Sequence, residues 1–400
     1  MVRMLRNYRY RLYPSLKQQE GLFRLFDLCC EMWNHLFGVS QWSYQTTGEE
    51  FSSRKTLYSL VKATKDTVFR FQDVHSQLLQ NTADRLSKAY QGFFRKVARF
   101  PRFKRRVRSI TFPDADQVTG YRLVSDKRLR LSGIGTVPIV MHRPLGGRVK
   151  TCTIKRTKDG RWWAIFSCEV EAGQREHPCP GNKVGIDVGL ISFAALSTGE
   201  EIEHPRYLAR AEKRLKKLQR RVSRKKRKSM NRKKAAQRAA RAHARVARQR
   251  TDFLHKLSFH LVQHYGFIAV EALNIRGMVK NHRLAKHISD ASWGRFIQML
   301  AYKAVTAGGQ LIPVAARDTS QLCSKCGNKT TIGLGQRTFA CARCGLSLGR
   351  DINAARNILA RATAGPAGSH ACGDQASTPP LQEEGASQVA EAGTICGNVS

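Results

Sequence analysis

Apolar and polar residues alternate with two different periods in the first half of the chain. Residues 7–13 alternate aromatic or aliphatic side chains with arginines, which predicts a strand. Ser15 then opens a helix, with Gln18 placed for a capping box, and residues 22–37 keep one helix face apolar. A second helical pattern runs over residues 78–97.

The period changes to two between about residue 107 and residue 171. Strands are predicted at 109–112, 128–131, 137–141, 148–156 and 161–171. Lys158-Asp159-Gly160 separates the last two strands and is typical of a tight hairpin turn. The pattern predicts a helical block that is inserted into, or flanked by, a small β-barrel.

Strands and helices alternate in the second half, after a proline-containing linker over 173–181. Residues 206–250 predict one long helix, or a helix pair broken near 229–231. The other predicted elements are strands over 183–187, 192–196, 267–273 and 310–314, and helices over 253–265 and 291–307. This alternation indicates an α/β domain. Past Arg361 there is no lysine or arginine, so a disordered acidic tail is predicted for 364–400.

The formal net charge of this chain is +41, which is far larger than that of an ordinary enzyme of 400 residues. Such an excess repels itself unless a polyanion neutralises it, and nucleic acid is the usual polyanion. An anionic membrane is the competing partner. The basic residues are spread over several segments without an apolar anchor, however, and no stretch approaches a transmembrane span. We therefore expect a soluble, intracellular protein that binds nucleic acid.

The segment 206–250 concentrates this charge, with 21 lysines or arginines and a single acid, Glu212. A charged helical segment is often just a solvated face. Like charges spaced four apart destabilise a helix, however, so this density favours contact with phosphates.

Three carboxylates stand where a nuclease could use them. Asp187 and Glu271 end two apolar strands, and Asp351 lies in the first turn of a predicted helix. Each has an ordinary structural reading, as a strand end facing solvent or as a helix cap. Together they match the set that two Mg²⁺ ions need for phosphodiester hydrolysis.

Eleven cysteines are present, and four of them have metal-ligand spacing. Cys323-x-x-Cys326 and Cys341-x-x-Cys344 form two knuckles, each followed by a glycine that suits a turn with positive φ. Four thiolates at this spacing predict one structural Zn²⁺ ion rather than a redox pair. The odd total and the scatter of the remaining cysteines argue against a disulfide framework.

Several of these motifs together resemble the TnpB family of insertion-sequence proteins, relatives of the compact type V CRISPR effectors. The resemblance covers about residues 1–360 and is strongest from 181. It rests on Pro101-Arg102-Phe103-Lys104, Gly185-Ile186-Asp187-Val188-Gly189-Leu190, the basic helix within 205–231, Asp252-Phe253-Leu254-His255-Lys256-Leu257-Ser258, Val270-Glu271-Ala272-Leu273-Asn274, Ile288-Ser289-Asp290-Ala291-Ser292-Trp293-Gly294, the zinc knuckles and Arg350-Asp351-Ile352-Asn353-Ala354-Ala355.

The resemblance implies a multidomain protein that combines α/β and β folds. A RuvC-like nuclease domain with an RNase H fold would occupy 181–318 and 348–363, with the basic helical segment at 205–250 and a zinc ribbon inserted at 319–347. An OB-like wedge barrel would occupy 1–14 and 101–172, with a helical recognition insert at 15–100. The catalytic acids of the family fall on Asp187, Glu271 and Asp351.

The implied function is transposon-encoded, RNA-guided cleavage of double-stranded DNA beside a short adjacent motif. The partners would be a guide RNA from the element end, the target DNA and a nearby transposase, in a prokaryotic cytoplasm and on the nucleoid when bound. The expected nucleic-acid contacts are Arg102, Lys104, Arg105, Arg106, Arg220, Arg221, Arg224, Lys225, Lys226 and Arg227. A nuclease-inactive guided repressor, a compact CRISPR effector, a transposase and a plain RNA-binding zinc-ribbon protein are the alternatives.

Overall fold

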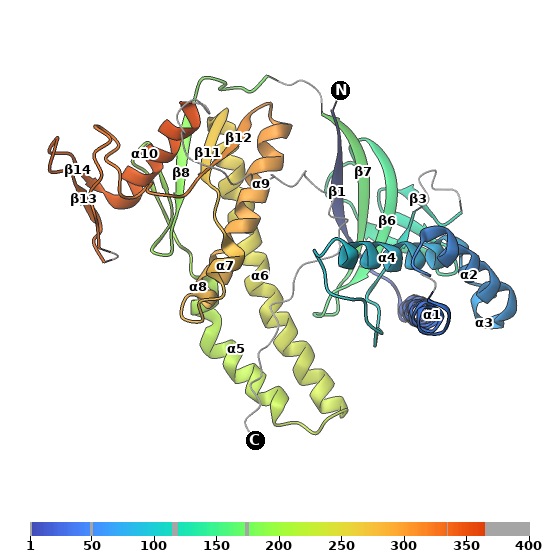
Figure 1. The fold of residues 1–400 in the computed structure, drawn as a ribbon. Helices are drawn as coiled ribbons and strands as arrows, with labels where there is room; N and C mark the ends of the chain where they lie inside the picture. Colours follow the sequence, from blue (N-terminus) through green and yellow to red (C-terminus); the bar gives the residue numbers. More distant parts are fainter. Residues whose placement is uncertain (1, 49–50, 114–118, 173–175, 334, 365–400) are drawn as a thin grey trace.

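The computed structural model describes residues 2–48, 51–113, 119–172, 176–333 and 335–364, and the predicted acidic tail lies almost wholly outside them. Two sheets, each with its own hydrophobic core, form two halves of the molecule (Figure 1). Across these described residues, no helix is both long and apolar enough to cross a membrane.

The N-terminal half is built on a seven-stranded antiparallel sheet. Its spatial order is β2 (Ser109–Phe112), β6 (Arg148–Arg156), β7 (Trp162–Ala172), β1 (Val2–Leu12), β5 (Gly135–Val140), β4 (Arg128–Leu131) and β3 (Tyr121–Ser125). The first strand of the chain pairs along its whole length with β7, from Val2↔Ala172 to Leu12↔Trp162. The predicted strands are confirmed, but β3 was missed because only Tyr121 in it is buried.

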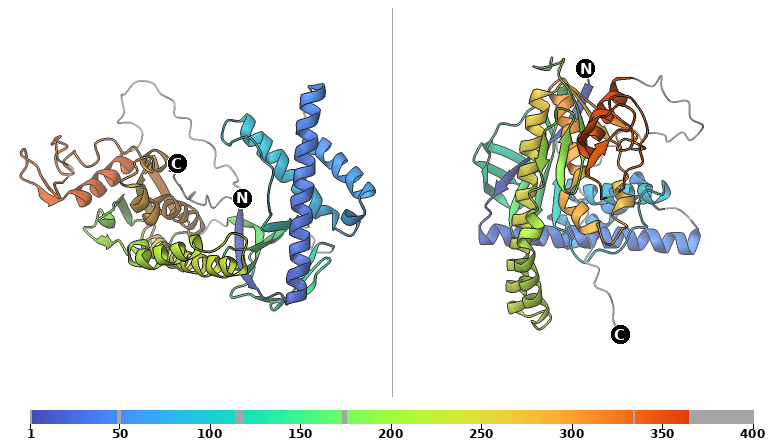
Figure 2. Two further views of the ribbon diagram at one scale, coloured as in Figure 1. Left: turned by 90° about the horizontal axis from the view of Figure 1, so that it is seen from below. Right: turned by 90° about the vertical axis from the view of Figure 1, so that its left-hand side faces the viewer.

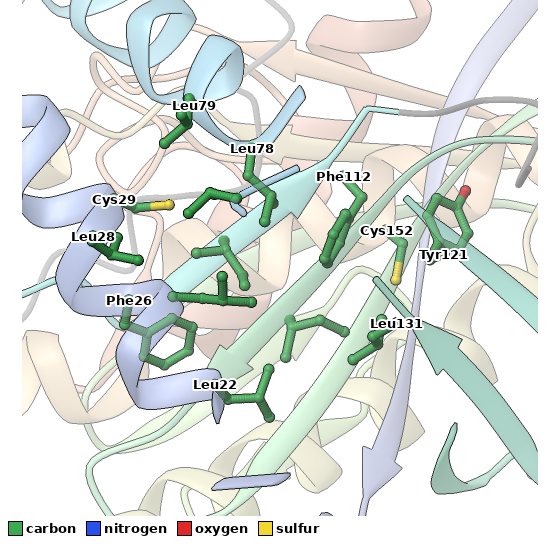
Figure 3. Close-up of a cluster of buried hydrophobic side chains, with 14 of the residues drawn as sticks. Leu22, Phe26, Leu28, Cys29, Leu78, Leu79, Phe112, Tyr121, Leu131 and Cys152 are labelled. Carbon is green, nitrogen blue, oxygen red and sulfur yellow. The ribbon is translucent and has the colours of Figure 1, made fainter. Parts of the chain in front are cut away.

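Four helices lie between β1 and β2 in the chain. They are α1 (Leu16–Thr47), α2 (Arg54–Thr67), α3 (Phe69–Gln72) and α4 (Ser76–Phe94). The predicted capping box is confirmed, because Ser15 and Gln18 each accept a hydrogen bond from the other's backbone N–H. Helices α1 and α4 bury their apolar faces against the sheet, and Phe26 of α1 and Leu78 of α4 belong to the same buried cluster as Cys152 of β6 (Figure 3).

The C-terminal half contains a five-stranded sheet of mixed direction. Its order is β10 (Glu201–Glu203), β9 (Ser192–Leu196), β8 (Lys183–Val188), β11 (Phe267–Glu271) and β12 (Gln310–Val314). Strands β8, β9 and β10 are antiparallel neighbours, whereas β11 runs parallel to both β8 and β12. The first three strands therefore form a meander, and the last two return by crossover helices.

Helices cover this sheet and extend away from it (Figures 1 and 2). They are α5 (Tyr207–Ser223), α6 (Met230–His264), α7 (Ile275–Met278), α8 (Ala285–Ala291), α9 (Trp293–Thr306) and α10 (Arg350–Thr363), and a short hairpin of β13 (Thr338–Ala340) and β14 (Ser347–Gly349) precedes α10. Of the two alternatives predicted for the basic segment, the helix pair broken near 229–231 is confirmed, with Ser229 capping α6. The helix predicted over 253–265 is confirmed, and it forms the last part of α6, which runs on without a break because neither glycine nor proline interrupts that stretch.

An ion pair between a buried acid and a half-exposed arginine joins the two halves. Asp159, in the turn between β6 and β7, accepts a 3.1 Å hydrogen bond from Arg248 of α6, and the carboxylate side chain is only 3% exposed. The hairpin expected at this position therefore also anchors the middle of the long helix α6.

Helix α10 packs against β8 through the backbone at Gly185. A Cβ atom built on Gly185 would overlap the carbonyl oxygen of Ala355 and would lie 2.8 Å from the backbone nitrogen of Leu359. Only glycine therefore lets the helix approach this closely.

We expect Gly185→Ala to push α10 away from the sheet and to destabilise the fold by about 1–3 kcal/mol or more, the usual range for overpacking. Thermal unfolding monitored by circular dichroism measures the change. Gly181→Ala is the matched control, since a Cβ there meets no atom within 4 Å. Equal melting temperatures for the two variants would contradict the packing argument.

Candidate active site and metal centre

Two of the three predicted acids lie side by side at one edge of the sheet. Strand β11 pairs in parallel with β8, with Val270 opposite Ile186. The next residue on each strand is an acid, Glu271 on β11 and Asp187 on β8. Neighbouring strands are about 4.8 Å apart, so this register brings the two carboxylates to the same carboxyl edge.

Helix α10 brings the third acid to the same place. Residues 185 and 187 face the same side of β8, and Gly185 faces α10. Asp351 lies one turn before Ala355 on that helix, and its Oδ2 atom comes within 3.9 Å of the Cβ position of Gly189. Asp187 therefore faces the helix that carries Asp351.

Mutual repulsion makes the charged forms of these carboxylates less stable. Burial, together with repulsion from Glu271 and Asp351, raises the pKa of Asp187 well above its usual value, although Arg350 partly offsets this. Burial also raises the pKa of Glu271, against the stabilising hydrogen bond that its carboxylate accepts from Thr319. A bound cation would remove this penalty, because it favours the charged form of all three groups.

The donor set therefore fits Mg²⁺, which takes carboxylate oxygens and keeps several waters. The oxygen atoms of the three acids do not all lie close enough to one another to coordinate a single ion. In the part of the chain that the structure describes, only the cysteine cluster brings its ligand atoms within 4.8 Å of one another. Two ions about 4 Å apart are coordinated by carboxylates that are spaced more widely than the ligands of one ion, so the spacing of the three acids fits two ions.

A network that the sequence analysis did not identify joins these acids to the cysteine segment. Asn357 of α10 donates to the carbonyl oxygens of Thr319 and Leu322, at 2.8 and 2.7 Å. Asn353, one turn earlier, donates to Leu322 and accepts from the backbone of Ser324. Two buried asparagines four residues apart on an otherwise apolar helix face were the available signal, since buried amides need partners.

The four predicted zinc ligands form one cluster. The sulfur of Cys323 lies 3.6 Å from that of Cys344, and the sulfur of Cys326 lies 3.6 Å from that of Cys341. Tetrahedral coordination with Zn–S bonds of about 2.3 Å places sulfurs about 3.8 Å apart, so this cluster fits zinc and is too open for disulfides. Backbone donation from Cys344 lowers the pKa of Cys341 to about 6, which favours the thiolate.

The knuckle glycines behave as expected, since φ is 71° at Gly327 and 69° at Gly345. Phe339 of β13 is fully buried between the knuckles and forms the small core of the segment. No disulfide links any of the nine described cysteines.

The predicted nucleic-acid contacts occupy two surfaces. Arg220 and Arg221 lie in the last turn of α5, and the other four predicted residues of this group lie in the exposed connection to α6. Six cations of α5 and its C-terminal end line one open hollow: Lys213, Lys216, Lys217, Arg220, Arg221 and Arg224.

The second surface follows α4 and presents Arg102, Arg105 and Arg106 to solvent. Lys104 is different, because its ammonium lies 3.0 Å from the ring centre of Trp33 in α1. Burial lowers its pKa to about 8. The role of Lys104 in binding stays a prediction, whereas its role in holding this turn against α1 is visible in the structure.

Asp290 holds the basic helices in place, and the sequence analysis gave it no role of its own. Helix α5 begins after Arg206, whose φ of 47° is left-handed and whose side chain provides no cap. Asp290 of α8 supplies the missing acceptor: Oδ2 accepts from the backbone of Leu208 at 3.2 Å, and Oδ1 accepts from Arg250 of α6 at 2.6 Å. One carboxylate thus fixes three helices.

Comparison with protein families gives three matches along the chain. Residues 165–282 match a family described as "Probable transposase" (OrfB of IS605), and residues 293–358 match the "Cas12f1-like, TNB domain". Residues 1–49 match a family described as "Helix-turn-helix domain". In this structure the described part of 1–49 contains the strand β1 and the single 32-residue helix α1.

Two bacterial relatives match over nearly their full length. A protein of Streptomyces pristinaespiralis named "Putative RNA-guided DNA endonuclease" is 36% identical, covering 94% of this chain and 92% of its own. The similarly named InsQ of Escherichia coli (strain K12) is 30% identical, covering 96% and 98%. Among solved structures, the Cas12f1–sgRNA–target DNA complex matches with a TM-score of 0.57 at 13% identity, over 89% of this chain and 98% of that chain, which shows similarity of the mixed α/β fold.

We expect Cys341→Ser to lower zinc content and folded yield together, because a structural zinc site contributes directly to folding. Zinc is measured per purified protein by plasma mass spectrometry. Cys179→Ser is the control, since this cysteine lies outside the cluster. Unchanged zinc stoichiometry in Cys341→Ser would contradict coordination by four thiolates.

Asp290→Ala should destabilise the protein by about 3–5 kcal/mol, because it leaves the partly buried Arg250 without its partner. Hydrogen exchange should also increase at the first turn of α5. Asp252→Ala removes the same charge from an ion pair that is 63% exposed on the acid side, and should cost less than about 1 kcal/mol. Exchange at α5 that matches the wild-type protein would refute the capping role.

Proposed function

Because the chain belongs to the TnpB family of RNA-guided DNA endonucleases, we propose that it uses a guide RNA to find and cut double-stranded DNA. The observation that carries the proposal is the meeting of Asp187, Glu271 and Asp351 at one sheet edge, from segments up to 164 residues apart, in a chain with a formal net charge of +41. Neither feature alone would require a guided nuclease.

The arrangement of the C-terminal half supports a RuvC-like domain with an RNase H fold. Three antiparallel strands followed by two parallel ones, in the order β10-β9-β8-β11-β12, are the topology expected of that fold. We assign this domain to 181–318 and 348–363, with the zinc ribbon at 319–347. The antiparallel sheet with helices between β1 and β2 supports a wedge barrel at 1–14 and 101–172 that carries a recognition insert at 15–100.

We assign the catalytic role to the three acids. Two Mg²⁺ ions held there would supply an activated water and stabilise the leaving oxygen of the phosphodiester. Asp187 and Glu271 are fixed by the sheet register, and Thr319 orients Glu271 through a hydrogen bond. Asp351 is fixed by the packing of α10 on Gly185.

The cationic surface would hold the nucleic acids. A guide RNA, its duplex with the target strand and the displaced DNA strand carry far more phosphates than one groove could neutralise. The cation-lined hollow of α5 and the exposed arginines after α4 provide two separate tracks. Base pairing would then read the sequence, and the protein would read backbone shape and the short adjacent motif.

We expect Asp187→Ala to reduce cleavage of a guide-matched plasmid by about 10³-fold or more, since several kcal/mol of transition-state stabilisation would be lost. Binding of RNA and of target DNA should change by less than about twofold, because removing an acid from a cationic protein does not weaken phosphate contacts. The protein is purified with the RNA that its native locus supplies, and the complex is given Mg²⁺ and a plasmid library with randomised flanks.

Glu200→Ala is the matched control, because this acid is exposed on the turn between β9 and β10. Cuts beside one flank motif by the wild-type and control complexes, and none by Asp187→Ala, would support the proposal. Target binding without cleavage by the wild-type complex would favour a guided repressor instead. Loss of both binding and cleavage in Asp187→Ala would refute the catalytic assignment.

A further inference from the structure

An exposed aromatic cluster lies at the end of α4 and in the turn that follows it. The exposed fractions are 38% for Phe93, 54% for Phe94, 42% for Phe100 and 60% for Phe103. Large apolar side chains concentrated in a sixteen-residue stretch are unusual on a protein surface and indicate a binding site. We call residues 91–106 the aromatic–basic segment.

The rings of this cluster pack against one another and against aromatic residues of α1 and α4, and these contacts hold their exposed faces in fixed positions. Phe103 packs edge-on against Phe37 of α1, with ring centres 4.8 Å apart. Phe100 packs edge-on against Phe93 at 5.0 Å, and Phe94 stacks on Tyr90 with an interplanar angle of 19°. Rings fixed by neighbours lose little conformational entropy when a ligand stacks on them.

Charge determines which ligand fits these rings. The aromatic–basic segment contains seven lysines and arginines and no acid. Six of them are exposed, and none of these six is in an ion pair with a described carboxylate: Arg95, Lys96, Arg99, Arg102, Arg105 and Arg106. A second copy of this chain would bring the same charge to the contact and be repelled.

The segment also lies on the side of the N-terminal half that faces the C-terminal half (Figures 1 and 2). Nucleic acid that passes between the two halves would therefore meet these rings. A double helix hides the faces of its bases, whereas a single strand exposes both faces to stacking.

We propose that the aromatic–basic segment binds unpaired bases of a single-stranded polynucleotide, with Phe94 and Phe103 stacking on bases and the arginines holding the flanking phosphates. The proposal deepens the proposed function, because guided opening of DNA creates unpaired bases. It does not depend on cleavage, since stacking needs neither metal nor guide.

The test uses photocrosslinking to locate the contact. The full-length protein is mixed with a short single-stranded oligonucleotide that carries 5-iodouracil, in an excess of unlabelled duplex DNA that occupies sites of purely electrostatic binding. Crosslinked peptides are identified by mass spectrometry. Crosslinks at Phe94 or Phe103 are expected, and RNA and DNA versions of the oligonucleotide show which strand is preferred.

Two variants quantify the stacking. Phe94→Leu and Phe103→Leu keep an apolar side chain but lose the ring face, and each should weaken single-strand binding by about 5- to 100-fold at unchanged salt dependence. An oligonucleotide with abasic positions should bind the wild-type protein as weakly as the variants do. Phe69→Leu, at a phenylalanine of α3 that is 80% exposed and outside the segment, is the matched control.

Equal binding by the wild-type protein and both variants, with no crosslink in the segment, would overturn the proposal. A concentration-dependent dimer that Phe94→Leu abolishes would also overturn it in favour of self-association. Base-dependent binding by a protein that never cuts DNA would uphold this inference while the proposed function fails, so the two outcomes are distinguishable.

Discussion

The close packing of helix α10 on strand β8 is the constraint on which the candidate site depends. Gly185 lets the helix backbone touch the strand, and this contact fixes Asp351 beside Asp187 although 163 residues separate them in the chain. The same helix holds the start of the cysteine segment through Asn353 and Asn357. Anything that moves α10 therefore moves an acid of the candidate site and the cysteine segment together.

Two groups of acidic residues have different roles in this cationic chain. Three of them gather at the sheet edge, where burial and mutual repulsion raise the pKa of Asp187. Others fasten the basic helices: Asp159 pairs with Arg248, Asp290 pairs with Arg250, and Glu212 pairs with Lys216 and Lys286. Paired charges thus hold α5 and α6 against the rest of the fold, while the exposed, unpaired cations stay available to a polyanion.

Local periodicity identified most of the elements, and the failures have physical causes. Helix α2 was missed because its buried stripe consists only of Leu57, Val61 and Thr64. Strand β10 has only three residues and none is buried, so no alternation could identify it. Helix α6 was predicted as two ranges, 206–250 and 253–265, whereas the backbone continues from Met230 to His264 because neither glycine nor proline interrupts it.

The sequence by itself determined the four candidate zinc ligands, the cationic character and the three candidate acids, because each depends on residue type and short-range spacing. It also determined the capping box and the knuckle turns, which are local. Only the tertiary structure decided that Asp187 and Glu271 stand in register, that Asp290 caps a helix 82 residues away, and that Lys104 packs on Trp33. These contacts join distant segments, and their partners are chosen by packing in three dimensions rather than by any pattern along the chain.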